Sequence, residues 1–230
     1  SAVIVPPMRT CLLLSIALFA SCTTTDRFEY SPPPDAGPAP SNERLVQRPF
    51  DQVWSCLIES VGKTFFAIDN FERDSGLLTL SFSTRPFSHA VDGGHVRVLF
   101  DNSSAVAGRA FWFGGNQQAT KIDFDGNYAD WVEQYLGGQM NGRMNIVVRK
   151  ASENTTRVTI NTRFVITSVS TFGGTATTTT WSWSSGERAS QTLTDKKGNR
   201  VSRVFQSTGF VEKKILDQLE LLAPAEAPAR

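Results

Sequence analysis

Two segments of the chain carry apolar residues at the spacing of an amphipathic helix. The first segment starts at Pro49-Phe50-Asp51, and Asp51 is its candidate N-cap. The second segment runs from about residue 207 to residue 222, and Ser207 or Thr208 is its candidate N-cap. The apolar positions are Val53, Trp54, Leu57, Ile58, Val61 and Phe65 in the first segment, and Phe210, Val211, Ile215, Leu219 and Leu222 in the second. Spacings of three and four residues place each set on one helix face, which must pack on another layer to leave water.

Between the two helices, alternation of apolar and polar residues predicts antiparallel strands. Turn-rich residues separate 67–71 from 77–82, and 144–150 from 157–166, so each pair predicts a hairpin. A further strand is predicted at 177–184 by the same alternation. Shorter elements are expected as strands at 44–50, 95–100, 109–113 and 189–195, and as a helix at 128–136. A helix, a run of strands and a closing helix together predict an α+β fold.

Residues 8–22, MRTCLLLSIALFASC, have the organisation of a signal peptide. Arg9 supplies the positive charge, an apolar run follows, and Ala20-Ser21 are the small residues before a cleavage site. The apolar run is shorter than the roughly 20 residues that cross a bilayer. Phe19-Ala20-Ser21-Cys22 resembles a lipobox, although Phe19 stands where leucine is usual. We therefore expect residues 1–21 to be an upstream extension and a lipoprotein signal peptide; the alternative is an ordinary secretory signal with an incidental cysteine.

A lipobox implies that Cys22 carries the membrane anchor. By resemblance to lipoproteins, its thiol takes a diacylglycerol and its freed amino group a fatty acyl chain such as palmitate. Two or more chains hold a protein stably on a membrane without spanning it. Thr23 follows the cysteine, where aspartate is the usual inner-membrane retention signal, so the resemblance implies a lipid-anchored protein of the outer membrane that faces the periplasm.

Three regions are expected to follow the signal. Residues 22–43 comprise Cys22 and a Pro-rich linker, residues 44–222 an α+β domain, and residues 223–230 a flexible tail. The linker has too little apolar surface to offset the cost of ordering. We expect Phe28 and Tyr30 within it to be solvated, with docking on a partner or on the domain as the alternative.

Composition narrows the partners and the chemistry. The 230 residues include 23 Lys and Arg against 22 Asp and Glu, and a nearly neutral chain without a basic run argues against nucleic acid as a partner. Of the three cysteines, Cys11 leaves with the signal and Cys22 is lipidated. Only Cys56 remains, on the apolar face of the first helix, so neither an intramolecular disulfide nor a Cys-rich zinc site is expected.

Residues 48–82, RPFDQVWSCLIESVGKTFFAIDNFERDSGLLTLSF, are similar to the openings of helix-grip domains in bacterial outer-membrane lipoproteins of the BamC-like kind. The closing FQSTGFVEKKIL is similar to the entry of their last helix. The resemblance implies an antiparallel β-sheet gripping a long C-terminal helix, with an amphipathic helix before it, and an accessory role in an envelope complex. Its motifs are packing residues, and the middle of the chain does not align.

Few residues form a motif that carries chemistry. His89 and His95, with Asp92 between them, lack the further ligand that a metal site needs. The segment Asp123-Phe-Asp125-Gly126-Asn127 resembles a calcium-binding loop, but its glycine comes too early, so we interpret it as a turn. We expect no metal, no cofactor and no catalytic residue. Trp181, Trp183 and Phe210 could line an apolar cavity under the C-terminal helix, although core packing is the more ordinary role of such aromatic residues.

Two main hypotheses follow from the sequence. The first is a non-enzymatic, lipid-anchored scaffold or accessory subunit of an envelope complex, whose partners are the membrane and other envelope proteins. The second is a binder or carrier of a lipid or other apolar ligand in the cavity beneath the C-terminal helix. A hydrolase whose site is assembled from distant residues is the third. Stoichiometry and the identity of any partner are not predicted.

Overall fold

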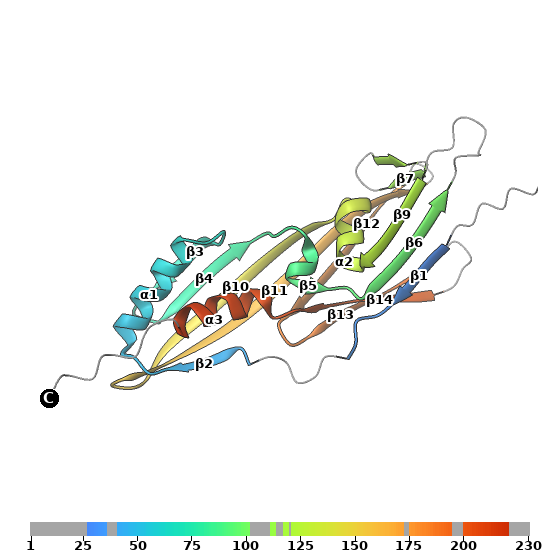
Figure 1. Cartoon of the computed structure of the whole chain (residues 1–230). Coiled ribbons are helices and arrows are strands. Elements are labelled where there is room, and N and C mark those ends of the chain that lie inside the picture. Colours follow the sequence, from blue (N-terminus) through green and yellow to red (C-terminus); the bar gives the residue numbers. More distant parts are fainter. Residues whose placement is uncertain are drawn as a thin grey trace, which may run out of the picture.

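A long antiparallel sheet forms the body of the molecule (Figure 1). The computed structural model describes residues 27–35, 41–101, 111–113, 117–119, 121–172, 175–194 and 200–220. The strand order of the sheet is β12-β11-β10-β4-β3, and β2 pairs with the first part of β11. The bounds are β2 Glu43–Val46, β3 Ala67–Glu72, β4 Leu77–Phe82, β10 Gln139–Ser152, β11 Thr155–Phe172 and β12 Thr175–Ser184.

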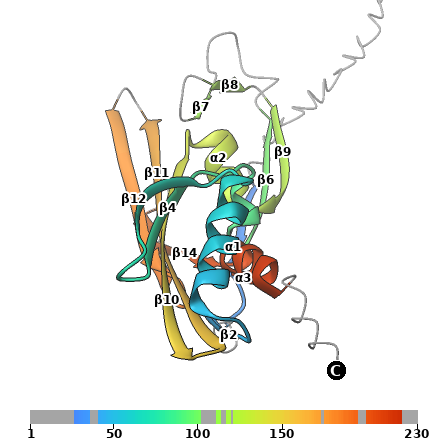
Figure 2. The same ribbon diagram turned by 90° about the vertical axis from the view of Figure 1, so that its left-hand side faces the viewer.

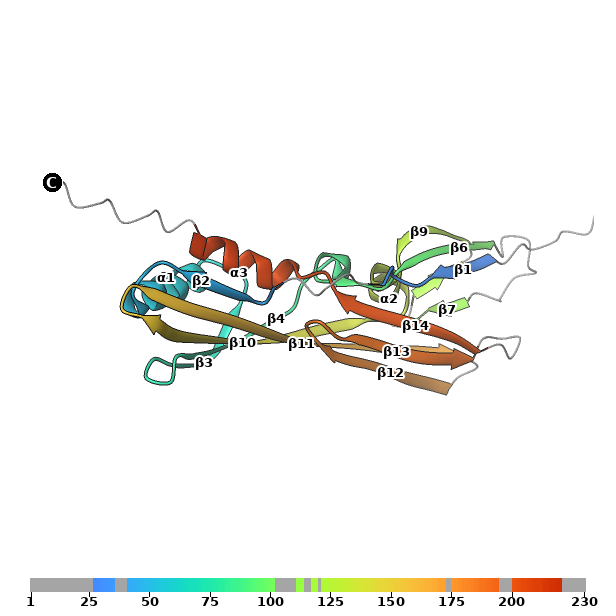
Figure 3. The same ribbon diagram turned by 90° about the horizontal axis from the view of Figure 1, so that it is seen from below.

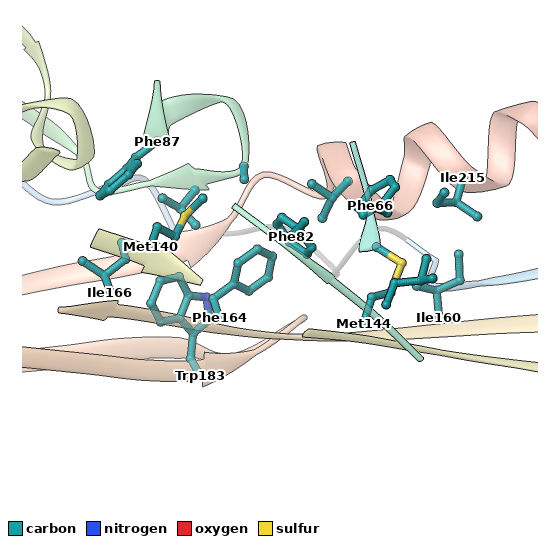
Figure 4. Packing of buried hydrophobic residues seen from close by; sticks show 14 of the residues in the cluster. Phe66, Phe82, Phe87, Met140, Met144, Ile160, Phe164, Ile166, Trp183 and Ile215 are labelled. Carbon is teal, nitrogen blue, oxygen red and sulfur yellow. The ribbon is translucent and has the colours of Figure 1, made fainter. Parts of the chain in front are cut away.

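One face of this sheet is apolar and the other is polar. Along β10, Met140, Met144, Ile146 and Val148 are buried while the residues between them face solvent or are only partly covered. Such alternation is what an antiparallel sheet with one covered face requires. The buried side chains meet those of the neighbouring strands in a continuous core, in which Phe82, Phe164 and Trp183 lie close together (Figure 4).

Helices α1 (Phe50–Gly62) and α3 (Phe210–Glu220) pack against each other and on the apolar face of the sheet (Figure 2). The buried face of α1 consists of Val53, Trp54, Leu57 and Val61, as the stripe in the sequence predicts. Asp51 is not the N-cap: the cap is Pro49, and Asp51 lies inside the helix, where it pairs with Arg73 at 2.6 Å. Proline suits a helix start because its missing N–H is not needed there.

Two smaller sheets lie at the other end of the molecule, away from α1 and β3 (Figures 1 and 3). One has the order β13-β14-β5 and the other β1-β6-β9, with α2 (Tyr128–Tyr135) beside them and a short hairpin of β7 and β8 nearby. The bounds are β1 Arg27–Ser31, η1 Phe87–His89, β5 Val91–Asp92, β6 His95–Asp101, β7 Phe111–Phe113, β8 Gln117–Ala119, β9 Lys121–Asn127, β13 Arg188–Thr194 and β14 Arg200–Ser207.

The predicted helix-grip fold is wrong. The described part of α3 has 11 residues, and it lies beside α1 on one face of a mostly antiparallel β structure instead of inside a curved sheet. The physical reason is that α3 is apolar on one side only, with Val211, Ile215 and Leu219 buried and Lys213 exposed. A single apolar stripe needs one packing surface, whereas a gripped helix needs apolar residues around most of its circumference.

The two predicted hairpins are confirmed as β3–β4 and β10–β11, but β10 and β11 are longer than predicted. The helix at 128–136 and the strand at 95–100 are also confirmed. Residues 123–127 lie in strand β9 and not in a turn. Residues 200–207 form a strand that the sequence analysis missed.

Part of the predicted linker packs on the domain. Residues 27–31 form β1, which pairs with β6 from Arg27 opposite Leu99 to Ser31 opposite His95. Phe28 and Tyr30 therefore lie in a strand that docks on the domain, and not in a solvated linker.

Candidate functional site

A cavity of about 760 Å³ lies beside the first turns of α3. The turn between β12 and β13, the end of β14 and residues of the segment before β2 form its other walls. Glycines at Gly186 and Gly209 make the two turns that shape it, because both adopt positive φ angles, 83° and 73°. Polar and charged residues make up most of the lining, and Leu216 is its large apolar side chain.

The start of α3 is fixed by two hydroxyl groups. The Ser207 Oγ accepts the N–H of Gly209 at 3.0 Å, and the Thr208 Oγ1 accepts the N–H of Phe210 at 3.3 Å. Hydroxyls at this position satisfy N–H groups that have no partner inside the helix. The N-cap position itself is held by Gly209, whose carbonyl accepts the N–H of Lys213 at 2.9 Å, so the predicted cap at Ser207 or Thr208 is wrong, although both hydroxyls bond N–H groups at the helix start. The third residue of α3, Glu212, lies at the cavity wall.

Glu212 is a buried carboxylate, with 5% of its surface exposed. Its Oε1 accepts the hydroxyl of Ser185 at 2.5 Å, and the same hydroxyl oxygen accepts the N–H of Thr162 at 3.0 Å. The Oε2 of Glu212 is buried and has no hydrogen-bond partner. Burying a charged oxygen without a partner is costly, so this atom is the least satisfied part of the cavity wall.

Gln206, near the end of strand β14, has a second unpaired acceptor. Its side chain is 8% exposed, its Nε2 lies 3.4 Å from the carbonyl of Pro34, and its Oε1 has no partner. Two ion pairs lie at the rim, with Arg188 2.5 Å from Asp35 and Lys213 2.5 Å from Asp217, and Arg44 and Glu187 also line the cavity. Both unpaired oxygens, Glu212 Oε2 and Gln206 Oε1, are enclosed by the protein and are not exposed to the cavity.

The three aromatic residues predicted to line an apolar cavity are not brought together. Trp181 and Trp183 are buried against Phe205, with ring centroids 5.1 and 5.8 Å from it, and Trp183 also stacks on Phe164. Phe210 is 45% exposed and lies next to His89, at 6.1 Å. None of the three lines the cavity beside α3. Cys22, the predicted lipidation site, lies outside the described residues.

The two histidines lie apart in the structure. His95 Nε2 is 2.6 Å from Asp125 Oδ1 on the exposed side of β6 and β9, whereas His89 lies near Phe210. Asp92 Oδ1 accepts the N–H of Gly94 at 2.8 Å and closes the turn between β5 and β6. Within the described part of the chain, no three His, Cys, Asp or Glu residues form a group that could hold a metal ion.

A buried arginine on β14 forms a second unusual environment. The guanidinium carbon of Arg203 lies 4.3 Å from the ring centroid of Tyr30, 4.9 Å from Phe28 and 5.5 Å from Tyr128. Tyr30 also accepts the N–H of Val204 through its hydroxyl, at 2.9 Å. Burial raises the pKa of Tyr128 to about 12, despite the opposing effect of the nearby Arg203 charge. These contacts clamp β1 on the domain; we call Arg203 with these three rings the Arg203 cage.

The sequence held a weak signal for β14 and for Arg203. In residues 200–207, Val201, Arg203 and Phe205 occupy every second position and so share one face of a strand, which places an arginine between two apolar residues of that face. Glu212 gave no comparable signal, because a glutamate in the first turn of a helix is ordinary. Only its contact with Ser185, 27 positions away in the chain, distinguishes it.

The edge strand β3 exposes apolar side chains. All six of its residues are exposed, and Ile68 and Phe71 have 42% and 61% of their surface accessible. One side of β3 pairs with β4, and the other side has no strand beside it among the described residues. Unpaired strand edges are places where a further chain can add by backbone hydrogen bonds.

Comparison with models of protein families, with curated proteins and with solved structures finds no match. Among the described residues, no helix is long and apolar enough to cross a membrane.

Proposed function

We propose that this protein is a lipid-anchored, non-catalytic scaffold or accessory subunit of a bacterial envelope complex, held at the outer membrane by Cys22 and facing the periplasm. The observation that carries the scaffold role is strand β3, which offers an unpaired edge beside the exposed side chains of Ile68 and Phe71. Partner segments bind such edges by adding a strand, with side-chain contacts providing specificity.

The position of β1 supports an arrangement in which one end of the molecule lies at the membrane and the other end binds a partner. Four residues, 23–26, separate Cys22 from β1. A chain spans at most about 3.3–3.6 Å per residue, so Cys22 can lie no more than roughly 18 Å from the start of β1. The end that contains β1 and β6 would lie close to the membrane, and the end with α1 and β3 would point away from it (Figure 1).

Exposed apolar residues at the far end are consistent with a protein partner. Phe65 is 45% exposed and lies next to Phe66 and Phe82 with centroid distances of 4.6 and 6.3 Å. Together with Ile68 and Phe71 it forms what we call the β3 patch. Large aromatic residues of this kind are enriched at the centres of protein interfaces.

An apolar-ligand carrier receives less support. Trp181 and Trp183 pack against core rings and do not line the cavity beside α3.

The anchor is tested by membrane fractionation of wild type and Cys22→Ala. We expect wild type in the outer-membrane fraction and the variant in the soluble periplasmic fraction, with mass spectrometry finding acyl chains on the N-terminal peptide of wild type only. If the variant remains in the membrane fraction, the lipoprotein assignment is wrong.

The scaffold role is tested by a photo-crosslinking residue at Phe71, with the same residue at exposed Lys150 as the matched control. We expect irradiation of cells to give one discrete adduct with an envelope protein at Phe71 and none at Lys150. Ile68→Lys, which introduces a charge into the apolar patch, should remove the partner from a mild-detergent extract without changing the amount of folded protein. Equal adducts at both positions, or none at Phe71, would refute the docking role of β3.

A further inference from the structure

We propose that the solvent-exposed face of the long sheet binds a polysaccharide that carries carboxylate groups. Helices α1 and α3 cover the opposite face of this sheet (Figure 3). The binding groups lie on the β10–β11 hairpin and form what we call the arginine strip, which consists of Arg143, Arg163, Asn145 and Asn161. This inference is independent of the scaffold role, because it needs neither the β3 patch nor the membrane anchor.

Two arginines lie directly opposite each other in the strip. Arg143 on β10 pairs with Arg163 on β11, and both side chains are exposed. Like charges at directly opposite positions destabilise a sheet. The smaller sheet has the ordinary arrangement, because Arg97 on β6 pairs with Glu29 on β1 and with Asp125 on β9. The Arg143–Arg163 pair is therefore a cost that the fold itself does not explain.

The acidic residues nearest to this pair are bonded elsewhere. Asp69 on β3 accepts the hydroxyl of Ser81 at 2.9 Å, and Glu187 accepts the N–H of Ser184 at 3.0 Å. These two serines are the outer cross-strand neighbours of the two arginines. Among the described residues, no carboxylate forms an ion pair with either guanidinium group of the strip. The positive charge of the strip is therefore available to an anion from outside.

A second pair of arginines lies further along the same hairpin. Arg149 pairs with Arg157 roughly 20 Å from the first arginine pair, because six residues of a strand separate the two positions. Here the charge is balanced within the protein. Arg157 forms an ion pair with Glu43 at 3.2 Å, and Glu72, which contacts Ser75 at 3.2 Å, is the other acid at this end of the described sheet face. The uncompensated charge is thus concentrated at the strip.

The two asparagines of the strip supply further hydrogen-bond donors. Asn145 and Asn161 lie opposite each other, next to the arginine pair. The Oδ1 of Asn145 accepts the hydroxyl of Thr79 at 3.1 Å, and the Oδ1 of Asn161 accepts the Nδ2 of Asn42 at 2.9 Å. Within the described part of the chain, the Nδ2 of each strip asparagine has no acceptor. The strip therefore presents N–H donors, which match carboxylate and hydroxyl oxygens.

A carboxylated polysaccharide has both kinds of oxygen. A guanidinium group binds a carboxylate through two parallel hydrogen bonds, and this geometry gives specificity as well as affinity. Amide N–H groups beside the arginines can donate to the hydroxyls of the same chain. A linear polymer can lie along the sheet, so that successive groups meet the arginine pair and then the asparagine pair.

The surroundings of the strip disfavour a protein or a membrane as the partner. The centres of protein interfaces are apolar and aromatic, whereas the residues beside the strip include Ser81, Asn141 and Ser182, and Val165 is only partly exposed. A peptide cannot add a strand here, because both edges of β10 and β11 are already paired. An anionic membrane attracts clusters of about four to eight basic residues, more than the strip contains.

The test is isothermal titration calorimetry of the purified full chain in a non-ionic detergent without a sugar headgroup. The probe is oligogalacturonate, compared with uncharged maltodextrin of the same chain length. We expect oligogalacturonate to bind with an affinity that falls as salt is raised, and maltodextrin to bind at least tenfold more weakly.

Two double variants separate the strip from the overall charge of the protein. Arg143→Gln with Arg163→Gln should weaken oligogalacturonate binding at least tenfold, and its melting temperature should equal or exceed that of wild type because the like-charge pair is gone. Lys63→Gln with Lys150→Gln removes the same charge from exposed residues outside the strip and should change binding less than twofold. Circular dichroism checks folding. If the arginine double variant does not fold, Arg143→Gln alone provides the second measurement, with an expected loss of about fivefold.

Four results would overturn the proposal. The first is the absence of oligogalacturonate binding to wild type, and the second is an equal loss of binding in the lysine double variant. The third is binding of oligoglutamate as tight as that of oligogalacturonate at the same chain length, which would assign the strip to an acidic protein segment. The fourth is tighter binding of the Cys22→Ala chain, which lacks the predicted anchor, to phosphatidylglycerol vesicles, which would assign the strip to a lipid surface.

Discussion

Two buried ionised residues near the start of α3 have opposite surroundings. Arg203, on β14, lies among the rings of Tyr30, Phe28 and Tyr128, and Glu212, nine positions later, lies on the wall of a cavity. Each is less than a tenth exposed and each has one polar atom without a hydrogen-bond partner. An unpaired atom therefore does not distinguish the two residues, but the space beside them does.

The two charges differ in the groups that surround them. The guanidinium of Arg203 is covered by aromatic faces, which attract a cation and fill the space around it. The carboxylate of Glu212 has a hydroxyl on one oxygen and a cavity next to it. We infer that the Arg203 charge stabilises the fold by holding β1, whereas the Glu212 carboxylate joins the start of α3 to the turn after β12 through the Ser185 hydroxyl. Four predictions test this difference, from the largest effect to the smallest.

Arg203→Ala should lower the free energy of unfolding by about 3 kcal/mol, because a buried cation–π contact contributes about 2 kcal/mol or more and the packed stem of the side chain is lost as well. Urea unfolding followed by tryptophan fluorescence measures the change. The control is Arg163→Ala, whose exposed side chain bonds Ser182 at 3.2 Å and whose loss should cost less than about 0.5 kcal/mol. Equal losses would mean that the Arg203 cage is not structural.

Stability should fall between about pH 10 and pH 12 because of Tyr128. Burial raises its folded-state pKa to about 12, from the 10 expected in the unfolded chain. In this window the folded state keeps a proton that the unfolded state loses, so stability is complete below pH 10 and is lost as pH rises, by about 2–3 kcal/mol for the two-unit shift. Unfolding at pH 9 and at pH 11.5 measures it. Tyr128→Phe should reduce the pH dependence; an unchanged slope would contradict the assignment.

Tyr30→Phe should cost about 1 kcal/mol. The ring and its contact with Arg203 remain, but the N–H of Val204 loses the acceptor that lies 2.9 Å away. Ser202→Ala, which removes an exposed hydroxyl contact with Ser190, is the matched control and should cost less than about 0.5 kcal/mol. A larger loss for the control would show that the strand pair β13–β14, and not the clamp on β1, controls stability here.

Glu212→Gln should change stability by no more than about 0.5 kcal/mol. The amide keeps the shape of the side chain and can accept the Ser185 hydroxyl, and the change removes a buried charge that has no partner. Thermal unfolding measures the effect. A loss of 2 kcal/mol or more would mean that Glu212 stabilises the start of α3, as Arg203 stabilises the docking of β1.

The local pattern of the sequence predicted many elements but not their arrangement. The stripe of Val53, Trp54, Leu57 and Val61 is buried as predicted, because helical spacing alone decides which face is apolar. The β10–β11 hairpin follows from alternation and from its turn. The helix-grip fold failed because α3 is apolar on one side, and nothing local shows whether its partner is a flat sheet, a curved sheet or a neighbouring helix.

The candidate site was least accessible to sequence analysis. Trp181 and Trp183 were correctly placed on one face of a strand, but the stripe does not show that Phe205 covers them or that Phe210 stays exposed. Phe28 and Tyr30 belong to a Pro-rich segment of low apolar content, and their docking depends on an arginine about 170 positions away. Such contacts are set by the tertiary fold.

By itself, the sequence determined which segments become helices and strands and which of their faces are apolar, because backbone period and side-chain hydrophobicity act within a few residues. It also predicts the lipid anchor at Cys22 from a contiguous motif. Only the tertiary structure decided that β1 closes over Arg203 and that Ser185 meets Glu212 beside a cavity. The physical reason is that the environment of a buried charge is created by chain segments distant in sequence.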